Sequence, residues 1–254
     1  MTKPRVLIPV ALGTNRDHDL ALAFEAAGAE ATSVPLTALR SGEVALTDFQ
    51  MLGVPGGFSY GDALGAGRLL GLDLGSWFAD QLAEAVAREM PIIGVCNGFQ
   101  ALVSAGLLPG APAKAVLTEN QSHVFECRWV MLQPGLASNS VWTNGLTEPL
   151  RCPVAHAEGR FVADDLAALE AAGQVALRYA NPDGTLADTA YPANPNGSAG
   201  DVAGISDATG LVLGLMPHPE DHILDRHDPL RGRAGSDAGR CLPLFEAGVA
   251  AVKG

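Results

Sequence analysis

Cys96 stands where an apolar, strand-like segment gives way to a helix-like one, in the sequence PIIGVCNGFQ. Gly98 follows two residues later, and small residues here are typical of a nucleophile elbow, a tight turn that projects one side chain from a sheet edge. A helix start favours a thiolate, and the N–H groups of the turn can stabilise an oxyanion. Cys96 is therefore a candidate nucleophile, although taken alone it is equally consistent with a buried cysteine that packs as a small apolar residue.

A thiolate nucleophile needs a general base and a group that orients this base. The sequence LMPHPE offers both, because His218 and Glu220 follow the apolar segment 211–216, which we expect to be a strand. Glu220 can accept the second imidazole N–H of His218, which selects a tautomer and stabilises the imidazolium. The alternative is a histidine in an exposed loop with an acidic neighbour.

The other five histidines differ in their sequence surroundings. His18, His222 and His227 stand among polar residues with no strand before them, so we expect them on the surface. His123 and His156 stay candidate members of the site.

The composition provides material for a large core and no excess of positive charge. The chain has 254 residues, 48% of them hydrophobic, and a net charge of -12, which argues against nonspecific nucleic-acid binding. No apolar stretch reaches the ~18 residues that span a bilayer, so we expect a cytoplasmic protein without membrane insertion. The remaining cysteines lack C-x-x-C spacing and predict neither a zinc site nor a disulfide framework. They are Cys127, Cys152 and Cys241.

The first half of the chain alternates strand-like and helix-like segments. Helical spacing predicts one helix from Asp17, its N-cap, to Gly28, and another over 73–90. Such alternation predicts a doubly wound α/β fold with a mostly parallel sheet and helices on both faces. Ligands bind at the carboxyl ends of the strands in these sheets, where Cys96 stands. The expected strands are 6–12, 31–36, 49–54 and 91–95.

The second half is less regular. Residues 181–200 are dense in Pro, Gly and Asn and predict a long loop, of a size that is often functional. A hairpin is expected over 201–216. We find no linker or repeat and expect a single domain over 1–254. Further strands are expected at 124–132, 153–156 and 174–180.

The segments GVCNGFQ around Cys96 and PHPE at 217–220 together resemble the triad-type class I glutamine amidotransferases. Within this class, the chain is similar to the glutaminase subunits of phosphoribosylformylglycinamidine synthase, from about residue 5 to 225. The resemblance implies the flavodoxin-like fold of the class. Four further stretches carry it: PGGFSYGD at 55–62, AHAEGRF at 155–161, NPNGS at 194–198 and AGISDATGLVLGLMPHPEDH at 203–222.

The resemblance also implies a role for individual residues. It makes Cys96 the nucleophile, His218 the base and Glu220 the group that orients the base. The backbone N–H groups of Gly57 and Asn97 would form the oxyanion hole.

Two more positions belong to the substrate pocket by resemblance. Gln100 would hold the substrate glutamine, and His156 would line the same pocket. From the residues alone, Gln100 could equally be a polar residue on a solvated helix face, and His156 a partly buried histidine with satisfied hydrogen bonds.

The activity implied by the resemblance is hydrolysis of glutamine to glutamate and ammonia through a γ-glutamyl thioester. A large synthase subunit would use the ammonia, with ATP and Mg²⁺, to convert formylglycinamide ribonucleotide to formylglycinamidine ribonucleotide in de novo purine synthesis. Whether a small third subunit assists stays open. We expect no metal or cofactor in this chain, and neither nucleic acid nor membrane as a partner.

Some positions depart from the family pattern. Relatives often carry cysteine where Arg16 stands and glycine where Ala157 stands, and neither position belongs to the triad. The segment after the triad is longer than in compact members, and its arginines could contact an acidic partner or substrate or lie in a solvated loop. They are Arg226, Arg231 and Arg233.

Three alternative functions are compatible with parts of the sequence. A glutaminase for anthranilate or cytidine nucleotide synthesis would share the triad, but PGGFSYGD and NPNGS weigh against it. Peptidase-like and glyoxalase-like enzymes use the same elbow cysteine and generally lack the PHPE pair. A flavodoxin-type binding module would need a phosphate loop, and the spacing of Gly65, Gly67 and Gly71 does not fit G-x-G-x-x-G.

Overall fold

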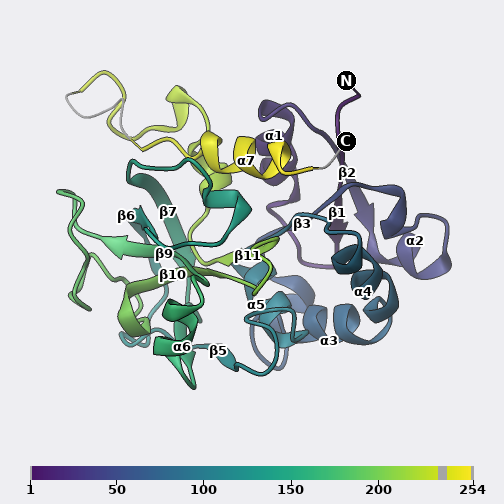
Figure 1. Cartoon of the computed structure of the whole chain (residues 1–254), viewed down its shortest axis with the longest axis horizontal. Coiled ribbons are helices and arrows are strands. Elements are labelled where there is room, and N and C mark those ends of the chain that lie inside the picture. The colour runs from purple at the N-terminus through teal and green to yellow at the C-terminus, as the bar shows by residue number, and fades with distance from the viewer. Residues whose placement is uncertain (1, 234–238, 253–254) are drawn as a thin grey trace.

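The computed structural model describes residues 2–233 and 239–252. A nine-stranded sheet of these residues crosses the molecule in the order β2-β1-β3-β4-β11-β10-β9-β6-β7 (Figure 1). Strands from both halves of the chain join it, which supports the proposal of a single domain. Residues 1, 234–238 and 253–254 of the proposed domain 1–254 lie outside the described part. No helix of the described residues is long and apolar enough to cross a membrane.

One half of the sheet is parallel. Its neighbouring strands pair in the order β2, β1, β3, β4 and β11, all in the same direction. All four residues of β3, β4 and β11 are buried, as a strand covered by helices on both faces requires. The parallel strands are β1 (Arg5–Val10), β2 (Glu30–Pro35), β3 (Met51–Val54), β4 (Ile92–Val95) and β11 (Val212–Leu215).

The other half is antiparallel. The hairpin expected over 201–216 is present as β10 (Val202–Ser206) and β11, and a connection this short can join only antiparallel strands. Beyond β10 follow β9 (Val175–Ala180), β6 (Glu126–Pro134) and β7 (Leu150–His156), near the predicted positions. A separate pair, β5 (Ala115–Thr118) with β8 (Arg160–Ala163), was not predicted.

The helices lie on both faces of the sheet, as predicted for the α/β class. Figure 1 shows α1 and α7 on one side and α3, α4 and α5 on the other. The α-helices are α1 (Asp17–Ala26), α2 (Leu36–Ser41), α3 (Arg68–Ser76), α4 (Ala79–Ala87), α5 (Asn97–Ser104), α6 (Leu166–Ala171) and α7 (Leu242–Ala250). Short 3-10 helices are η1 (Leu46–Asp48), η2 (Ser59–Asp62), η3 (Val141–Thr143), η4 (Ala199–Asp201), η5 (Pro219–His222) and η6 (Asp225–His227).

Two details of the predicted helices are wrong. The single helix expected over 73–90 is broken into α3 and α4, because the N–H groups of Trp77 and Phe78 both donate to the Asp73 carbonyl and end the regular bonding pattern. The Phe78 side chain is buried at the break. Asp17 is the first residue of α1, and Arg16 occupies the N-cap position before it.

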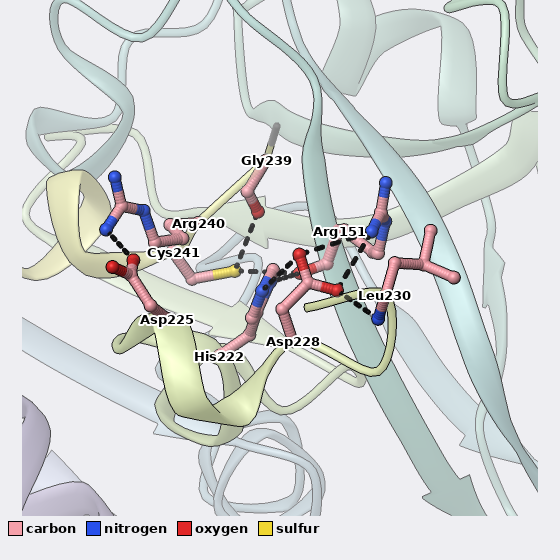
Figure 2. A network of polar contacts seen from close by, with 8 residues as sticks. All are labelled: Arg151, His222, Asp225, Asp228, Leu230, Gly239, Arg240 and Cys241. Atoms are coloured by element: carbon pink, nitrogen blue, oxygen red, sulfur yellow. Dashed lines mark hydrogen bonds and ion pairs between the residues drawn. The ribbon is translucent and has the colours of Figure 1, made fainter. Parts of the chain in front are cut away.

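The chain after the triad folds back over β7, as Figure 2 shows. The Cys241 N–H donates to the His222 carbonyl at 2.8 Å, and the Cys241 thiol donates to the Arg151 carbonyl at 3.3 Å. The Arg151 guanidinium pairs with Asp228 at 3.2 Å. This returning segment covers His222, whose side chain is fully buried. The surface position predicted for His222 is therefore wrong, whereas His18 is exposed as predicted and His227 is half-buried.

Candidate active site

Cys96 lies at a strained turn between β4 and α5. Its φ of 50° and ψ of -107° belong to a region that residues with a side chain rarely adopt. The turn is held because the Cys96 N–H donates to the Leu215 carbonyl and the Cys96 carbonyl accepts the Gln100 N–H. A Cβ atom at Gly98 would lie 2.0 Å from the Val54 carbonyl oxygen, so only glycine allows α5 to approach β3 this closely. The tight strand-to-helix turn predicted at Cys96 is confirmed, and Cys96 stays the candidate nucleophile.

His218 follows β11, the strand next to β4, and is brought to the elbow by the sheet order. Its backbone N–H donates to the Pro153 carbonyl at 2.8 Å, and its Nδ1 lies 2.7 Å from Oε1 of Glu220. The side chains of His218 and Glu220 are both buried. The exposed-loop alternative for His218 is therefore wrong.

The electrostatics of His218 reflect both neighbours. Burial by itself lowers the pKa of the imidazole, but the negative charges of Glu220 and Cys96, and hydrogen bonds to both, raise this pKa well above its usual value. Cys96 is thus one of the groups that set the charge state of His218. Sγ of Cys96 lies 3.8 Å from the Ala155 carbonyl oxygen. An imidazolium held beside a thiol is the arrangement that cysteine nucleophiles use.

The two proposed oxyanion donors lie next to the elbow. Asn97 is the first residue of α5, so its backbone N–H has no partner within the helix. Gly57 has a φ of 132°, and a Cβ there would lie 2.7 Å from the Asn15 nitrogen. The loop after β3 is fixed to the elbow because the Ser59 hydroxyl donates to the Asn97 side-chain oxygen at 2.5 Å.

Gln100 is buried, so its alternative as a residue on a solvated helix face is wrong. Its Nε2 donates to the Glu158 carbonyl at 2.6 Å, and its Oε1 accepts from the Asn97 side chain at 3.2 Å. Asn97 also donates to Asp62 at 3.0 Å. These bonds join the loop after β3, the elbow helix and the segment after β7.

His156 is buried near His218 and is neutral. Burial, with a further effect from the positive charge of His218, lowers the pKa of His156 to about 3. Its Nδ1 lies 3.1 Å from the Asn120 side-chain oxygen, while its Nε2 is buried and forms no hydrogen bond within the described residues. His123 is exposed, lies 3.2 Å from Glu119 and is not brought to the site.

Three residues at the site were not predicted from the sequence: Gly56, Asp221 and Arg16. A Cβ atom at Gly56 would lie 2.8 Å from Cε1 of His218, so Gly56 packs directly against the imidazole. Asp221 lies beside the triad and forms an ion pair with Arg16 from the first loop. The glycine pair in VPGG and the extra carboxylate in PHPED were visible signals, but only the fold shows what each contacts.

His218, Glu220 and Asp221 are also the one group among the described residues whose spacing would suit a metal, since their ligand atoms lie within 4.8 Å of one another. His218 and Glu220 bond to each other, however, and Asp221 pairs with Arg16. These contacts engage one donor atom of each residue, while Oε2 of Glu220 is buried and has no hydrogen-bond partner within the described residues. The arginines 226, 231 and 233 are exposed, and residues 234–238 of the same insertion lie outside the described part.

Comparison with known proteins places the chain in a family. The CobB/CobQ-like glutamine amidotransferase domain matches residues 3–251. Phosphoribosylformylglycinamidine synthase subunit PurQ of Treponema denticola is 44% identical, covering 97% of this chain and 98% of that protein. The corresponding subunit of Dehalococcoides mccartyi is 40% identical, covering 98% of each.

The fold agrees with these relatives. A chain in the solved structure of PurLQS from Thermotoga maritima is 32% identical, with a TM-score of 0.77, covering 99% of this chain and 100% of that one. The chain belongs to the CobB/CobQ-like glutamine amidotransferase family and, within it, to the group of PurQ subunits of phosphoribosylformylglycinamidine synthase.

Proposed function

We propose that this chain is the glutaminase subunit of a phosphoribosylformylglycinamidine synthase. It hydrolyses glutamine to glutamate and ammonia, and a synthase subunit uses the ammonia to make formylglycinamidine ribonucleotide in purine synthesis. One observation carries the chemistry: a strained elbow cysteine whose charge raises the pKa of a buried histidine, which is held at 2.7 Å by a buried carboxylate. The relatives named PurQ support the pathway.

In the first half-reaction, the Cys96 thiolate attacks the δ-carbonyl carbon of glutamine and forms a C–S bond. The carbonyl electrons move to oxygen, where the backbone N–H groups of Gly57 and Asn97 are the proposed donors. The His218 imidazolium then gives its proton to the leaving nitrogen, the C–N bond breaks and ammonia departs. A γ-glutamyl thioester remains on Cys96. Losing one donor of this kind costs about 3 kcal/mol of transition-state stabilisation.

The second half-reaction returns the enzyme to its starting state. Neutral His218 takes a proton from water as the water oxygen attacks the thioester carbon, and collapse of the intermediate breaks the C–S bond. Glutamate leaves and the thiolate–imidazolium pair is restored. Glu220 accepts the hydrogen bond from the Nδ1–H of His218 throughout, which keeps Nε2 directed at the thiol and stabilises the imidazolium.

His156 and Gln100 are proposed to shape the substrate pocket in different ways. The neutral His156 has a buried Nε2 without a protein partner, which suits a direct hydrogen bond to the substrate. Both ends of the Gln100 amide already bond to protein groups, so we propose that Gln100 holds the pocket segment at Glu158 in place.

The proposed steps need only glutamine, water and the side chains of this chain. We propose that ATP and Mg²⁺ are used by the synthase subunit. Docking of that subunit over the elbow is supported by exposed apolar side chains on the neighbouring loops, Leu12, Phe58 and Leu64. The loops that carry Leu12 and Phe58 are bonded to each other at the site, since the Phe58 N–H donates to the Gly13 carbonyl.

The chemistry can be tested by labelling. A glutamine-derived chloroketone or diazoketone should alkylate Cys96 and spare Cys127, which is exposed and serves as an internal control for simple accessibility. Excess glutamine should protect Cys96. Labelling of Cys127 in preference to Cys96, with the synthase subunit present, would refute the assignment of the nucleophile.

The division of labour needs a second experiment. In the complex, His218→Ala should abolish amidine formation from glutamine, while free ammonium should still support it. If both reactions vanish together in a complex that assembles normally, ammonia transfer between two subunits is wrong.

A further inference from the structure

Arg16 and Asp221 form an ion pair beside the triad that the reaction steps do not use. Arg16 comes from the loop before α1, and Asp221 follows Glu220 directly in η5. Arg16 also contacts Asp19 at 3.2 Å. About one third of the Arg16 side chain and one quarter of the Asp221 side chain are exposed, so the pair lies at the rim of the site.

Arg16 reaches the triad through its packing as well as its charge. A Cβ atom at Gly56 would lie 3.5 Å from Cγ of Arg16 and 2.8 Å from Cε1 of His218. The stem of Arg16 and the imidazole therefore lie against the same glycine. This contact places a fixed cation close to the histidine and carboxylate that carry out the proton transfers.

Asp221 places a second carboxylate close to His218 and Glu220. Its carboxylate, that of Glu220 and the His218 ring have ligand atoms within 4.8 Å of one another. Two carboxylates so close repel each other, and both can accept the same imidazole N–H. Burial and the charge of Glu220 raise the pKa of Asp221, while Arg16 and His218 act in the opposite direction.

We propose that Arg16 is a positioning residue of the glutaminase: by pairing with Asp221 it offsets this second carboxylate and draws it away from His218, so that Glu220 alone orients the imidazole. This inference rests on the proposed function. Among the described residues, the ionisable groups that interact with the pair include Asp19 on α1, Glu220 and His218 in the segment after β11, and Cys152 on β7.

The test compares Arg16→Met, Asp221→Asn and the double variant in the complex with the synthase subunit. Glutamine-dependent and ammonium-dependent amidine formation are both measured, with kcat, KM and the pH profile of kcat/KM. Arg88→Met is the matched control, because Arg88 forms an exposed surface pair with Glu84 at 2.6 Å. Circular dichroism melting checks that each variant is folded.

Arg16→Met leaves an uncompensated negative charge, so protons are held more tightly at the triad. We expect kcat/KM for glutamine to fall about tenfold at neutral pH and the acid limb to move up by about one pH unit. The double variant, which also lacks the Asp221 carboxylate, should have a kcat/KM within about threefold of wild type and an acid limb at the wild-type pH. The ammonium reaction and Arg88→Met should match wild type.

Two results would overturn the proposal: an Arg16→Met enzyme with the rate and pH profile of wild type, or a double variant no better than Arg16→Met. If Arg16→Met does not fold, Arg16→Gln keeps a hydrogen-bond donor without the charge. An unshifted acid limb in Arg16→Gln would also overturn the proposal. A wild-type complex that makes no amidine from glutamine would instead refute the proposed function itself.

Discussion

Gly56→Ala tests whether the position of the His218 ring limits the rate. The added methyl group would lie 2.8 Å from Cε1 of His218, whereas carbon atoms in ordinary contact are about 3.5 Å apart. The ring or the loop must therefore move by about 0.7 Å. Gly56 is not one of the described glycines with a positive φ, so alanine meets no backbone strain at this position. The effect of the substitution is therefore confined to the contact with His218.

The expected magnitude follows from this displacement. A misplacement of about 1 Å in an active site costs about a hundredfold in rate, so we expect kcat with glutamine to fall about tenfold to a hundredfold, which is about 1.4 to 2.7 kcal/mol of transition-state free energy. The His218–Glu220 bond of 2.7 Å resists the shift, because lengthening it weakens a charge-assisted hydrogen bond.

The assay is amidine formation by the complex with saturating glutamine and, separately, with ammonium. Ammonium-dependent activity should be unchanged. Gly75→Ala is the matched control, because its Cβ would meet Ala105 at an ordinary 3.5 Å inside α3. A Gly56→Ala complex within twofold of wild type with glutamine would refute the idea that Gly56 fixes the imidazole.

Three further outcomes are expected. Burial alone would lower the pKa of His218, but Glu220 and Cys96 raise this pKa by more, so the net shift is upward. The stabilising contribution of the charged imidazole is therefore complete below the unfolded pKa of about 6.5 and is lost as the pH rises through the folded pKa. Glu220→Gln should therefore lower Tm most below about pH 6.5, and a Tm difference that stays constant up to pH 9 would contradict this. Leu64→Asp should weaken binding of the synthase subunit in calorimetry, while Leu136→Asp, exposed in the turn after β6, should not; equal effects would argue against docking over the elbow. Gln100→Leu removes the bond to the Glu158 carbonyl and should lower Tm by a few degrees and raise KM for glutamine; an unchanged KM would show that this bond does not maintain the pocket.

Much of the fold could be read from local patterns. Runs of buried aliphatic residues marked β3, β4 and β11, and the alternation with helical segments predicted a parallel sheet. The break between α3 and α4 could not be predicted this way, since the sequence stays helix-like through Trp77, where the Trp77 and Phe78 N–H groups share the Asp73 carbonyl and the Phe78 side chain is buried. The pair β5 and β8 was missed because each strand is short and weakly patterned.

The sequence by itself determined the parts of the site that depend on neighbours in the chain. A small residue two positions after Cys96 defines the elbow, and Glu220 lies within reach of His218 because one proline separates them. These features are local, so a short stretch of chain contains all the groups that produce them.

Only the tertiary structure decided which distant groups meet. The sheet order sets β11 beside β4 and so brings His218 to Cys96, and the loop before α1 delivers Arg16 to Asp221. The returning C-terminal segment buries His222, which looked like a surface residue. Burial and long-range pairing depend on the packing of whole elements, and residues far apart in the chain carry no local pattern that specifies it.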